Sequence, residues 1–269
     1  MERRHILLEG NLNLRDLGGY MSGDGRRVRS GCLFRSDELH ALTDADLEIV
    51  TSLGIGVVFD LRNPMERAAR PNRLPVDVEL LERTSPSAGG DGRTTEEQIA
   101  LGELPIRDDE LFATVYVDLL DRLAPELRMI VERAVDAPVR PLLFHCAAGK
   151  DRTGVVAAVL LGLLGVPDDV ILDDYELTTT YYTPRRMKAL AAAMAEHGVA
   201  DERVRPLLEA RRPVLAATLR HLHERWDGFD SYATEHLGVS REVPDGLRAA
   251  LLVADRSLDE AAVGARPGE

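Results

Sequence analysis

The feature that most constrains the fold of this chain is a short apolar segment that leads directly into a polar turn and then into an apolar stretch. Residues 142–144 (Leu-Leu-Phe) precede the ten residues His-Cys-Ala-Ala-Gly-Lys-Asp-Arg-Thr-Gly at 145–154, and an uncharged run follows to Gly165. A buried strand, a tight turn and a helix that ends at a glycine explain this order. The sequence therefore predicts a strand-to-helix unit of an α/β fold.

A second unit of the same kind lies earlier in the chain. Residues 55–59 predict a buried strand, Asp60-Leu61-Arg62 leaves it, and Asn63-Pro64-Met65-Glu66 opens a helix with a cap and a first-turn proline. Two such units predict a largely parallel sheet covered by helices on both faces. Functional sites in such sheets gather at the carboxyl ends of the strands, so we expect Asp60 and Cys146 to open onto one crevice.

The rest of the chain is predicted to be mainly helical and to belong to one domain over 1–269. Thr43 is expected to cap a helix, with Asp46 three residues later and Gly54 at its end. No internal repeat or long linker divides the chain. Further helices are expected at 95–104, 110–123, 125–135 and over most of 184–253, with an exposed loop at 84–92 and a frayed tail beyond 262.

Charge and apolar patterning exclude several classes of function. The 269 residues carry a formal net charge of −13. This argues against a general binder of nucleic acid or of anionic membranes, since both attract basic surfaces. The longest apolar run, at 155–164, is too short to span a bilayer, and the first residues lack the apolar run of a signal peptide. We expect a cytoplasmic protein without an integral membrane segment; export by an unconventional route and the oligomeric state stay open.

The cysteine content limits metal and disulfide chemistry. Cys32 and Cys146 are the two cysteines of the chain, too few for a disulfide framework or a four-cysteine zinc site. We expect no metal and no other cofactor. Cys32 is expected to pack in the interior, and its alternative role is to protect an oxidised Cys146 by forming a disulfide with it.

The turn at 145–154 carries the residues of a phosphate site with its own nucleophile. Five residues separate Cys146 from Arg152, and the backbone amides between them can curl around a tetrahedral dianion at the positive end of the next helix dipole. Arg152 can add a bidentate fork to two phosphate oxygens. The same field favours the thiolate form of Cys146. The expected phosphate-binding residues are Ala147, Ala148, Gly149, Lys150, Asp151 and Arg152.

A phosphate monoester bound in this turn would meet the Cys146 sulfur in line. Transfer to sulfur would give a thiophosphoryl-enzyme that water then hydrolyses, while the loop amides and Arg152 stabilise the charge on the equatorial oxygens. Thr153 is expected to stabilise the cysteine as it leaves, and His145 to orient the cysteine backbone rather than act as a base. These residues predict a metal-independent phosphomonoesterase.

Other interpretations of the turn fit it less well. A nucleotide-binding loop would need glycine at 144 and Ser or Thr at 151, where this chain has Phe144 and Asp151. A papain-like protease, or a tight turn around an inert buried cysteine, would not explain Arg152 and its spacing. A phosphate-reading pseudoenzyme stays open as a different class, although such readers commonly lose the cysteine or the arginine.

With these residues in view, the motif at 145–154 resembles the signature of cysteine-dependent protein tyrosine phosphatases. More narrowly, the chain resembles the atypical bacterial tyrosine phosphatases of the PtpB type, which share the Lys-Asp pair in the turn. The similarity covers about residues 11–250 and is most specific in the turn. Further matches are Asn13-Leu14-Arg15-Asp16-Leu17-Gly18-Gly19, Leu33-Phe34-Arg35-Ser36, and Asp60-Leu61-Arg62 followed by Glu66.

The resemblance implies a phosphotyrosine-phosphatase-like α/β fold with a helical lid insertion at about 181–212 over the site. It also implies hydrolysis of phosphotyrosine, often with phosphoserine, phosphothreonine and phosphoinositides, so phosphorylated proteins or phosphoinositides are the expected partners. Lys150 and Asp151 match positions associated with lipid-phosphate tolerance; alternatively, Asp151 holds the Lys150 charge. A dedicated phosphatase for phosphoinositides or other small molecules is the runner-up among enzymes.

The proton donor for the leaving group is the least defined residue. The familiar Trp-Pro-Asp acid loop is absent, since the only tryptophan is Trp226. Asp60 is the first candidate, by the resemblance and by its place at a strand end. Its alternative role is to pair with Arg62 or to cap a turn. Asp151 is the second candidate, and Asp108 or Asp109 the third.

Overall fold

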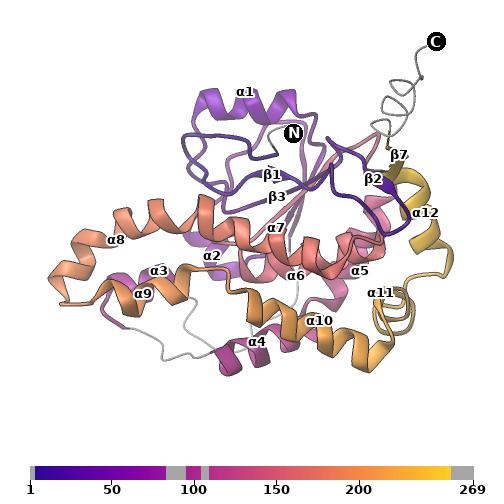
Figure 1. Cartoon of the computed structure of the whole chain (residues 1–269). Coiled ribbons are helices and arrows are strands. Elements are labelled where there is room, and N and C mark those ends of the chain that lie inside the picture. The colour runs from indigo at the N-terminus through magenta and orange to yellow at the C-terminus, as the bar shows by residue number, and fades with distance from the viewer. Residues whose placement is uncertain (1–3, 83–94, 104–108, 256–269) are drawn as a thin grey trace, which may run out of the picture.

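The structure is a computed structural model that describes residues 4–82, 95–103 and 109–255 (Figure 1). Its strands are β1 (Arg15–Asp16), β2 (Arg26–Val28), β3 (Leu33–Ser36), β4 (Val57–Asp60), β5 (Glu79–Glu82), β6 (Leu142–His145) and β7 (Leu252–Ala254). Five of them form a central sheet in the order β1-β3-β6-β4-β5, and β2 pairs with β7 in a separate two-stranded sheet.

The central sheet is parallel apart from one edge strand. β3 and β4 both run parallel to β6, β5 runs parallel to β4, and β1 is antiparallel to β3. The register places Ser36 and Asp60 on either side of His145, so the carboxyl ends of three strands meet at one edge. The predicted mostly parallel sheet is confirmed, and its geometry brings these strand ends together as expected.

Helices pack on both faces of this sheet, with α1 on one face and the longer helices on the other (Figure 1). They are α1 (Asp44–Ser52), α2 (Pro64–Ala69), α3 (Thr95–Ala100), α4 (Asp109–Arg122), α5 (Ala124–Ala134), α6 (Asp151–Leu163), α7 (Asp168–Tyr181), α8 (Thr183–Glu196), α9 (Asp201–Leu208), α10 (Arg212–Trp226), α11 (Phe229–Ser231), the π-helical turn η1 (Tyr232–His236) and α12 (Glu242–Leu251). None of the described helices has the length and apolar character needed to cross a membrane.

Alternate residues of the strands supply a core on each face. On β6, Leu143 joins Val58 and the α1 residue Val50 in one apolar cluster, whereas Leu142 and Phe144 belong to the larger cluster under the other helices. Successive side chains of a strand point to opposite faces, so a strand covered on both sides needs an unbroken apolar run. This explains why the sequence of β6 stays apolar until its last residue.

Two predicted helix starts are confirmed as capping boxes. Thr43 Oγ1 accepts the Asp46 N–H at 3.2 Å, and the Asp46 carboxylate accepts the Thr43 N–H at 3.0 Å. Asn63 and Glu66 make the same exchange at the start of α2. The predicted loop at 84–92 and the predicted tail beyond 262 lie outside the described residues.

Two predicted helices end earlier than expected. α3 stops at Ala100, before the predicted end at 104, and Gly102 beyond it adopts a positive φ of 75° that turns the chain away from the helix. Near the end of the described chain, Leu252–Ala254 forms β7 instead of continuing a helix, because it pairs antiparallel with β2. This pairing joins segments more than two hundred positions apart, which local periodicity does not report.

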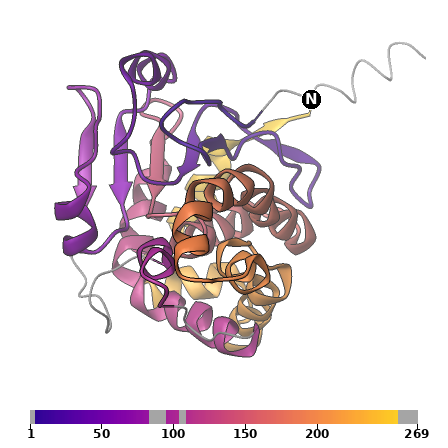
Figure 2. The ribbon, with the colours of Figure 1, turned by 90° about the vertical axis from the view of Figure 1, so that its left-hand side faces the viewer.

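The segment predicted as a lid contains α8 and α9. These two helices form a pair that extends from one end of the molecule, on the left in Figure 1. Figure 2 views the molecule from that end and shows β4, β5 and β6 of the central sheet to the left of the helical pair. The Thr183 hydroxyl, at the start of α8, donates to the carbonyl of Leu208, the last residue of α9, at 3.2 Å, so the two ends of the pair are joined.

Candidate active site

The turn predicted to bind phosphate joins β6 to α6. β6 ends at His145 and α6 begins at Asp151, and residues 146–150 between them are here named the anion loop. Cys146 is buried at its first position. Gly149 has a positive φ of 66°, and a Cβ at this position would lie 2.5 Å from the Ser36 carbonyl oxygen. Glycine is therefore required here, both for its backbone angle and because the end of β3 packs against it.

Arg152, in the first turn of α6, is held by a carboxylate from α2. Its Nη1 and Nη2 donate to Glu66 Oε2 and Oε1 at 2.7 and 2.8 Å, and Nη1 also donates to the Leu61 carbonyl at 3.2 Å. Burial opposes the Arg152 charge, but the Glu66 hydrogen bonds outweigh it and hold the pKa of Arg152 above its usual range. The charged guanidinium is thus fixed in one plane at the positive end of α6.

Glu66 is itself fixed by the start of α2. Its Oε2 accepts the Asn63 N–H at 2.7 Å in the capping box, so the cap that begins the helix also positions the partner of Arg152. From the sequence, Glu66 was expected to take part in the helix cap and to match the family pattern, but its contact with Arg152 was not predicted. The missing information was tertiary, because α2 and α6 are far apart in the chain.

Two buried donors contact the anion loop from outside the turn. Asn13 Nδ2 donates to the Ala148 and Gly149 carbonyls at 3.1 and 3.3 Å, and Arg35 Nη2 donates to the Gly149 carbonyl at 2.9 Å. The segments at 13–19 and 33–36 matched the family pattern, yet sequence reasoning assigned neither residue a function. A signal was present, since an arginine inside a buried strand must find polar partners.

His145 lies behind the anion loop as a neutral imidazole. It is buried, and its Nδ1 donates to the Cys146 carbonyl at 3.1 Å. Burial lowers the pKa of His145 to about 4, although the nearby Asp60 carboxylate acts in the opposite direction. The imidazole therefore fixes the backbone at Cys146 and is uncharged at neutral pH.

Asp60 lies at the end of β4 in a closed ion pair with Arg62. Its carboxylate accepts Arg62 Nη2 at 2.7 Å and Asn72 Nδ2 at 2.8 Å, and Oδ2 lies 3.7 Å from His145 Nε2. Burial opposes its charge, but His145 and the Arg62 hydrogen bonds lower the pKa of Asp60 to about 2. Asp60 is thus enclosed by its hydrogen-bond partners, and this pairing is the alternative role that the sequence left open.

Lys150 and Asp151 face away from the sheet, toward α4 and α9. Lys150 Nζ donates to the Leu207 carbonyl at 2.5 Å and lies 3.6 Å from Asp151 Oδ1. Asp151 Oδ1 accepts the Tyr116 hydroxyl at 2.5 Å, and Tyr175 lies 2.6 Å behind that hydroxyl. The Asp151 side chain is 38% exposed, whereas Asp60 is buried. Of the two first candidates for proton donor, Asp151 is the accessible one.

The comparison with known proteins decides the family. Residues 6–253 match the tyrosine phosphatase family. This chain belongs to that family. It is 35% identical over 241 residues to a Cupriavidus necator protein named as a tyrosine-protein phosphatase, covering 89% of this chain and 86% of that one. It is 30% identical to the triple specificity protein phosphatase PtpB of Mycobacterium tuberculosis, covering 91% of this chain and 98% of that one.

A third relative and a solved structure complete the comparison. The phosphatase is 28% identical over 228 residues to a tyrosine-protein phosphatase of Nostoc commune, covering 83% of this chain and 75% of that one. A crystal structure of P. aeruginosa TpbA covers 87% of this chain and 94% of that one, at 16% identity and a TM-score of 0.35. The sequence matches, and not this superposition, assign the family.

Three further predicted residues have defined surroundings in the phosphatase. Thr153 is buried, and in the described part of the chain its hydroxyl has no hydrogen-bond partner. Asp109, at the start of α4, pairs with Arg211 at 2.5 Å, and Asp108 lies outside the described residues.

Cys32 lies too far along its strand to reach Cys146. Leu33 pairs with Leu142 and Ser36 with His145, so Cys32 and Cys146 lie at opposite ends of neighbouring strands. At ~3.3 Å per residue their separation is roughly 16 Å, whereas a disulfide needs Cα atoms within about 7 Å. Burial raises the pKa of the Cys32 thiol to about 11. Cys32 is a core residue of the phosphatase, and the protective disulfide would require rearrangement of the sheet.

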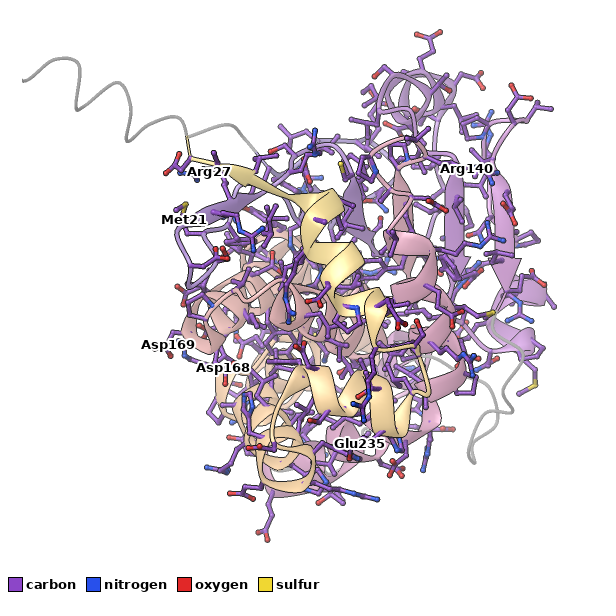
Figure 3. The ribbon with its side chains drawn as sticks, turned by 90° about the vertical axis from the view of Figure 1, so that its right-hand side faces the viewer. Met21, Arg27, Arg140, Asp168, Asp169 and Glu235 are labelled. Atoms are coloured by element: carbon purple, nitrogen blue, oxygen red, sulfur yellow. The ribbon has the colours of Figure 1, made fainter. Side chains whose placement is uncertain are left out.

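A large cavity lies at the other end of β3. Its volume is about 960 Å³, and its lining includes Ser30 and Gly31, which precede β3, whereas the anion loop packs against Ser36 at the strand's far end. Met21 and Arg27, also in the lining, lie close together beside β7 in Figure 3. The phosphatase therefore does not place its anion loop in this cavity, and a search guided by the cavity would have missed the loop.

Proposed function

We propose that this phosphatase hydrolyses phosphotyrosine through a covalent phosphoryl-cysteine intermediate on Cys146. The observation that carries the proposal is the pairing of Arg152 with Glu66, which fixes a charged guanidinium in the turn that begins with Cys146. A structural turn around an inert cysteine would not need an oriented, partly exposed arginine at this position. Phosphate recognition does need one, because its oxygens are bound best by a planar fork.

The proposed reaction has two balanced steps. The Cys146 sulfur attacks phosphorus as the bond to the leaving oxygen breaks, and that oxygen takes a proton from an acid. Water then attacks the phosphoryl group and gives a proton to the conjugate base of that acid, while the sulfur–phosphorus bond breaks and the Cys146 thiolate and inorganic phosphate are released. The amides of residues 147–152 and Arg152 stabilise the equatorial oxygens in both steps, and the Thr153 hydroxyl donates to the departing sulfur in the second.

We assign the remaining predicted residues to two roles. His145 and Asp60 position the loop, since the first is neutral and bound to the Cys146 carbonyl, and the second is ionised and paired with Arg62. Asp151 is the proton donor we favour over Asp60, because its carboxylate is partly exposed beside the anion loop and oriented by Tyr116. That Asp60 is the acid stays a prediction, and the rates of the two aspartate variants on alkyl and aryl phosphates decide between them.

The substrate range is the second part of the proposal. The relative PtpB is named for triple specificity, and we propose that this chain also accepts phosphoserine, phosphothreonine and phosphoinositides. The α8–α9 segment, at about 181–212, is proposed as a lid over the site, since Lys150 of the anion loop contacts Leu207 of α9. A dedicated phosphoinositide phosphatase and a non-hydrolysing phosphate reader are the alternatives.

An aryl-phosphate assay with a metal chelator tests the proposal. We expect turnover by the wild type in the presence of the chelator, and none by Cys146→Ser, which should still bind vanadate or phosphate. Hydrolysis by the serine variant would contradict the covalent route, and binding without turnover in the wild type would favour the phosphate reader. Relative rates on phosphopeptides and phosphoinositides then separate a protein phosphatase from a dedicated lipid phosphatase.

A further inference from the structure

The backbone carbonyls of the anion loop accept hydrogen bonds that have no part in the proposed reaction. Asn13 and Arg35 reach the carbonyls of two successive residues, Ala148 and Gly149, from two separate segments of the chain. Asn13 precedes β1, and Arg35 belongs to β3. Both side chains are buried, so each of these hydrogen bonds is shielded from competing water.

A bound carbonyl fixes the orientation of its peptide group. In a trans peptide, the carbonyl and the N–H of the next residue point in opposite directions, and the described chain holds no cis peptide bond. The bonds to the Ala148 and Gly149 carbonyls therefore turn the N–H groups of Gly149 and Lys150 toward the opposite side of the loop. These are two of the amides to which the proposed function assigns phosphate binding.

The two donors are themselves held by a buried ion network. Arg15 Nη1 donates to Asn13 Oδ1 at 2.5 Å, which leaves the Asn13 amide nitrogen facing the loop. Asp174, on α7, accepts Arg15 Nε at 3.1 Å on one oxygen and Arg35 Nη1 at 2.6 Å on the other. Tyr20 also donates to this carboxylate, at 2.9 Å. The orientation of the loop carbonyls thus depends on a residue of a helix outside the loop.

This network has an excess of positive charge. Two guanidinium groups, Arg15 and Arg35, share the single carboxylate of Asp174, and all three side chains are 1% exposed. The neutral Tyr20 hydroxyl does not change the balance. One uncompensated positive charge next to the anion loop would stabilise a bound dianion, and its effect is larger in a buried site than in water.

We propose that Asn13, Arg35 and Asp174 form a positioning cluster that orients the amides of residues 149 and 150 toward the phosphoryl group and adds a buried positive charge behind them. The inference rests on the proposed function, because it deepens the account of the same site. None of the three is a catalytic residue, since each acts through the loop and not on the substrate.

The test measures vanadate affinity and turnover in full-chain variants of Asn13. We expect Asn13→Ala to weaken vanadate binding and to lower kcat by at least about tenfold each, the usual effect of losing an aligned donor set. Asn13→Asp keeps the side-chain size but places oxygen against the loop carbonyls, so it should weaken vanadate binding further. The control is Tyr232→Phe, which removes a buried hydroxyl that donates to the Leu120 carbonyl at 2.8 Å, away from the anion loop.

Melting temperatures separate positioning from folding. Tyr232→Phe and Asn13→Ala should each lower the melting temperature, whereas Tyr232→Phe should change vanadate affinity by less than about threefold. In a second pair, Arg35→Lys should retain more vanadate affinity than Arg35→Met, because it keeps the buried charge. The Asn13 variants decide the question if the Arg35 variants do not fold.

Two results would contradict the account in different ways. If the wild type neither binds vanadate nor hydrolyses an aryl phosphate, the proposed function is overturned and the inference with it. If the wild type does both, and the Asn13 variants match Tyr232→Phe in vanadate affinity and kcat, the positioning cluster alone is overturned.

Discussion

The middle of the anion loop and its junction with α6 are held in different ways. At residues 148–149, the carbonyls are bound by Asn13 and Arg35, which are buried among charged groups of the sheet side and α7. At residues 150–151, the side chains contact α9 and α4 through one hydrogen bond each, and Asp151 is 38% exposed. The carbonyls at 148–149 are therefore positioned from the sheet side, whereas the Lys150 and Asp151 side chains depend on the surrounding helices.

The largest expected effect separates Asp151 from Asp60 as proton donor. Asp151→Asn should lower kcat for an alkyl phosphate by about 10²- to 10⁴-fold and for an activated aryl phosphate by less than tenfold, since only the poorer leaving group needs the proton. Steady-state rates on both substrates check this. Asp118→Asn, which changes an exposed aspartate of α4 paired with Arg122, is the control, with rates near those of the wild type.

Asp60→Asn completes this comparison. We expect it to leave Arg62 buried without its carboxylate and so to lower the melting temperature, with the same change in rate on alkyl and aryl phosphates. A selective loss on alkyl phosphates in Asp60→Asn, together with a normal Asp151→Asn, would return the role of the acid to Asp60.

The next effect concerns the arginine at the start of α6. Glu66→Gln removes the charge that pairs with Arg152 and should lower kcat/KM by about 10- to 100-fold, the range for a hydrogen bond to a charged group. Glu79→Gln, which changes an ion-paired glutamate on β5 far along the sheet edge, should change kcat/KM by less than about twofold. Equal effects of the two substitutions would show that Arg152 does not depend on Glu66.

A pH-dependent effect on stability is expected on the sheet side of the loop. Asp37 accepts the Asn13 N–H at 2.9 Å, but burial outweighs its hydrogen bonds and raises the pKa of Asp37 from 3.8 to about 7. Between these values the folded state keeps a proton that the unfolded state has released. The proton bound in the folded state stabilises it at low pH. The free energy of unfolding therefore falls as pH rises from 3.8 to about 7.

Asp37→Asn removes this contribution and can be compared with the wild type across pH. The melting temperature of the variant minus that of the wild type should increase by about 5 °C from acidic to neutral pH. His145 gives the opposite trend, because it must lose a proton to be buried in its neutral form. Its contribution is the same in the variant and in the wild type, so it cancels in this difference. A difference that stays constant with pH would contradict the raised pKa of Asp37.

The smallest expected effect lies on the helix side. Lys150→Met removes the hydrogen bond to the Leu207 carbonyl, so hydrogen exchange should increase in α9 while kcat on a small aryl phosphate changes by less than about threefold. If Lys150 instead contacts a second phosphate of the substrate, KM for a phosphoinositide should rise more than KM for the aryl phosphate. Unchanged exchange in α9 would show that this contact does not hold the helix.

The sequence alone was sufficient to predict the features that depend on residues close together in the chain. It predicted the parallel strands, both capping boxes and the loop between β6 and α6, because hydrophobic runs and cap residues are read within a few positions. It could not assign Asn13, Arg35 or Asp174, which act across separate segments. It also favoured Asp60 as the acid, which stays a prediction, and it left open the pairing with Arg62 that the structure shows.

The direct test of the central claim is to trap the phosphoryl group during turnover. Rapid acid quench of the wild type with a radiolabelled phosphotyrosine peptide, followed by digestion, should place the label on the peptide that contains Cys146, and Cys146→Ser should give none. Full turnover with no labelled peptide, or a label on a different residue, would contradict phosphoryl transfer to Cys146.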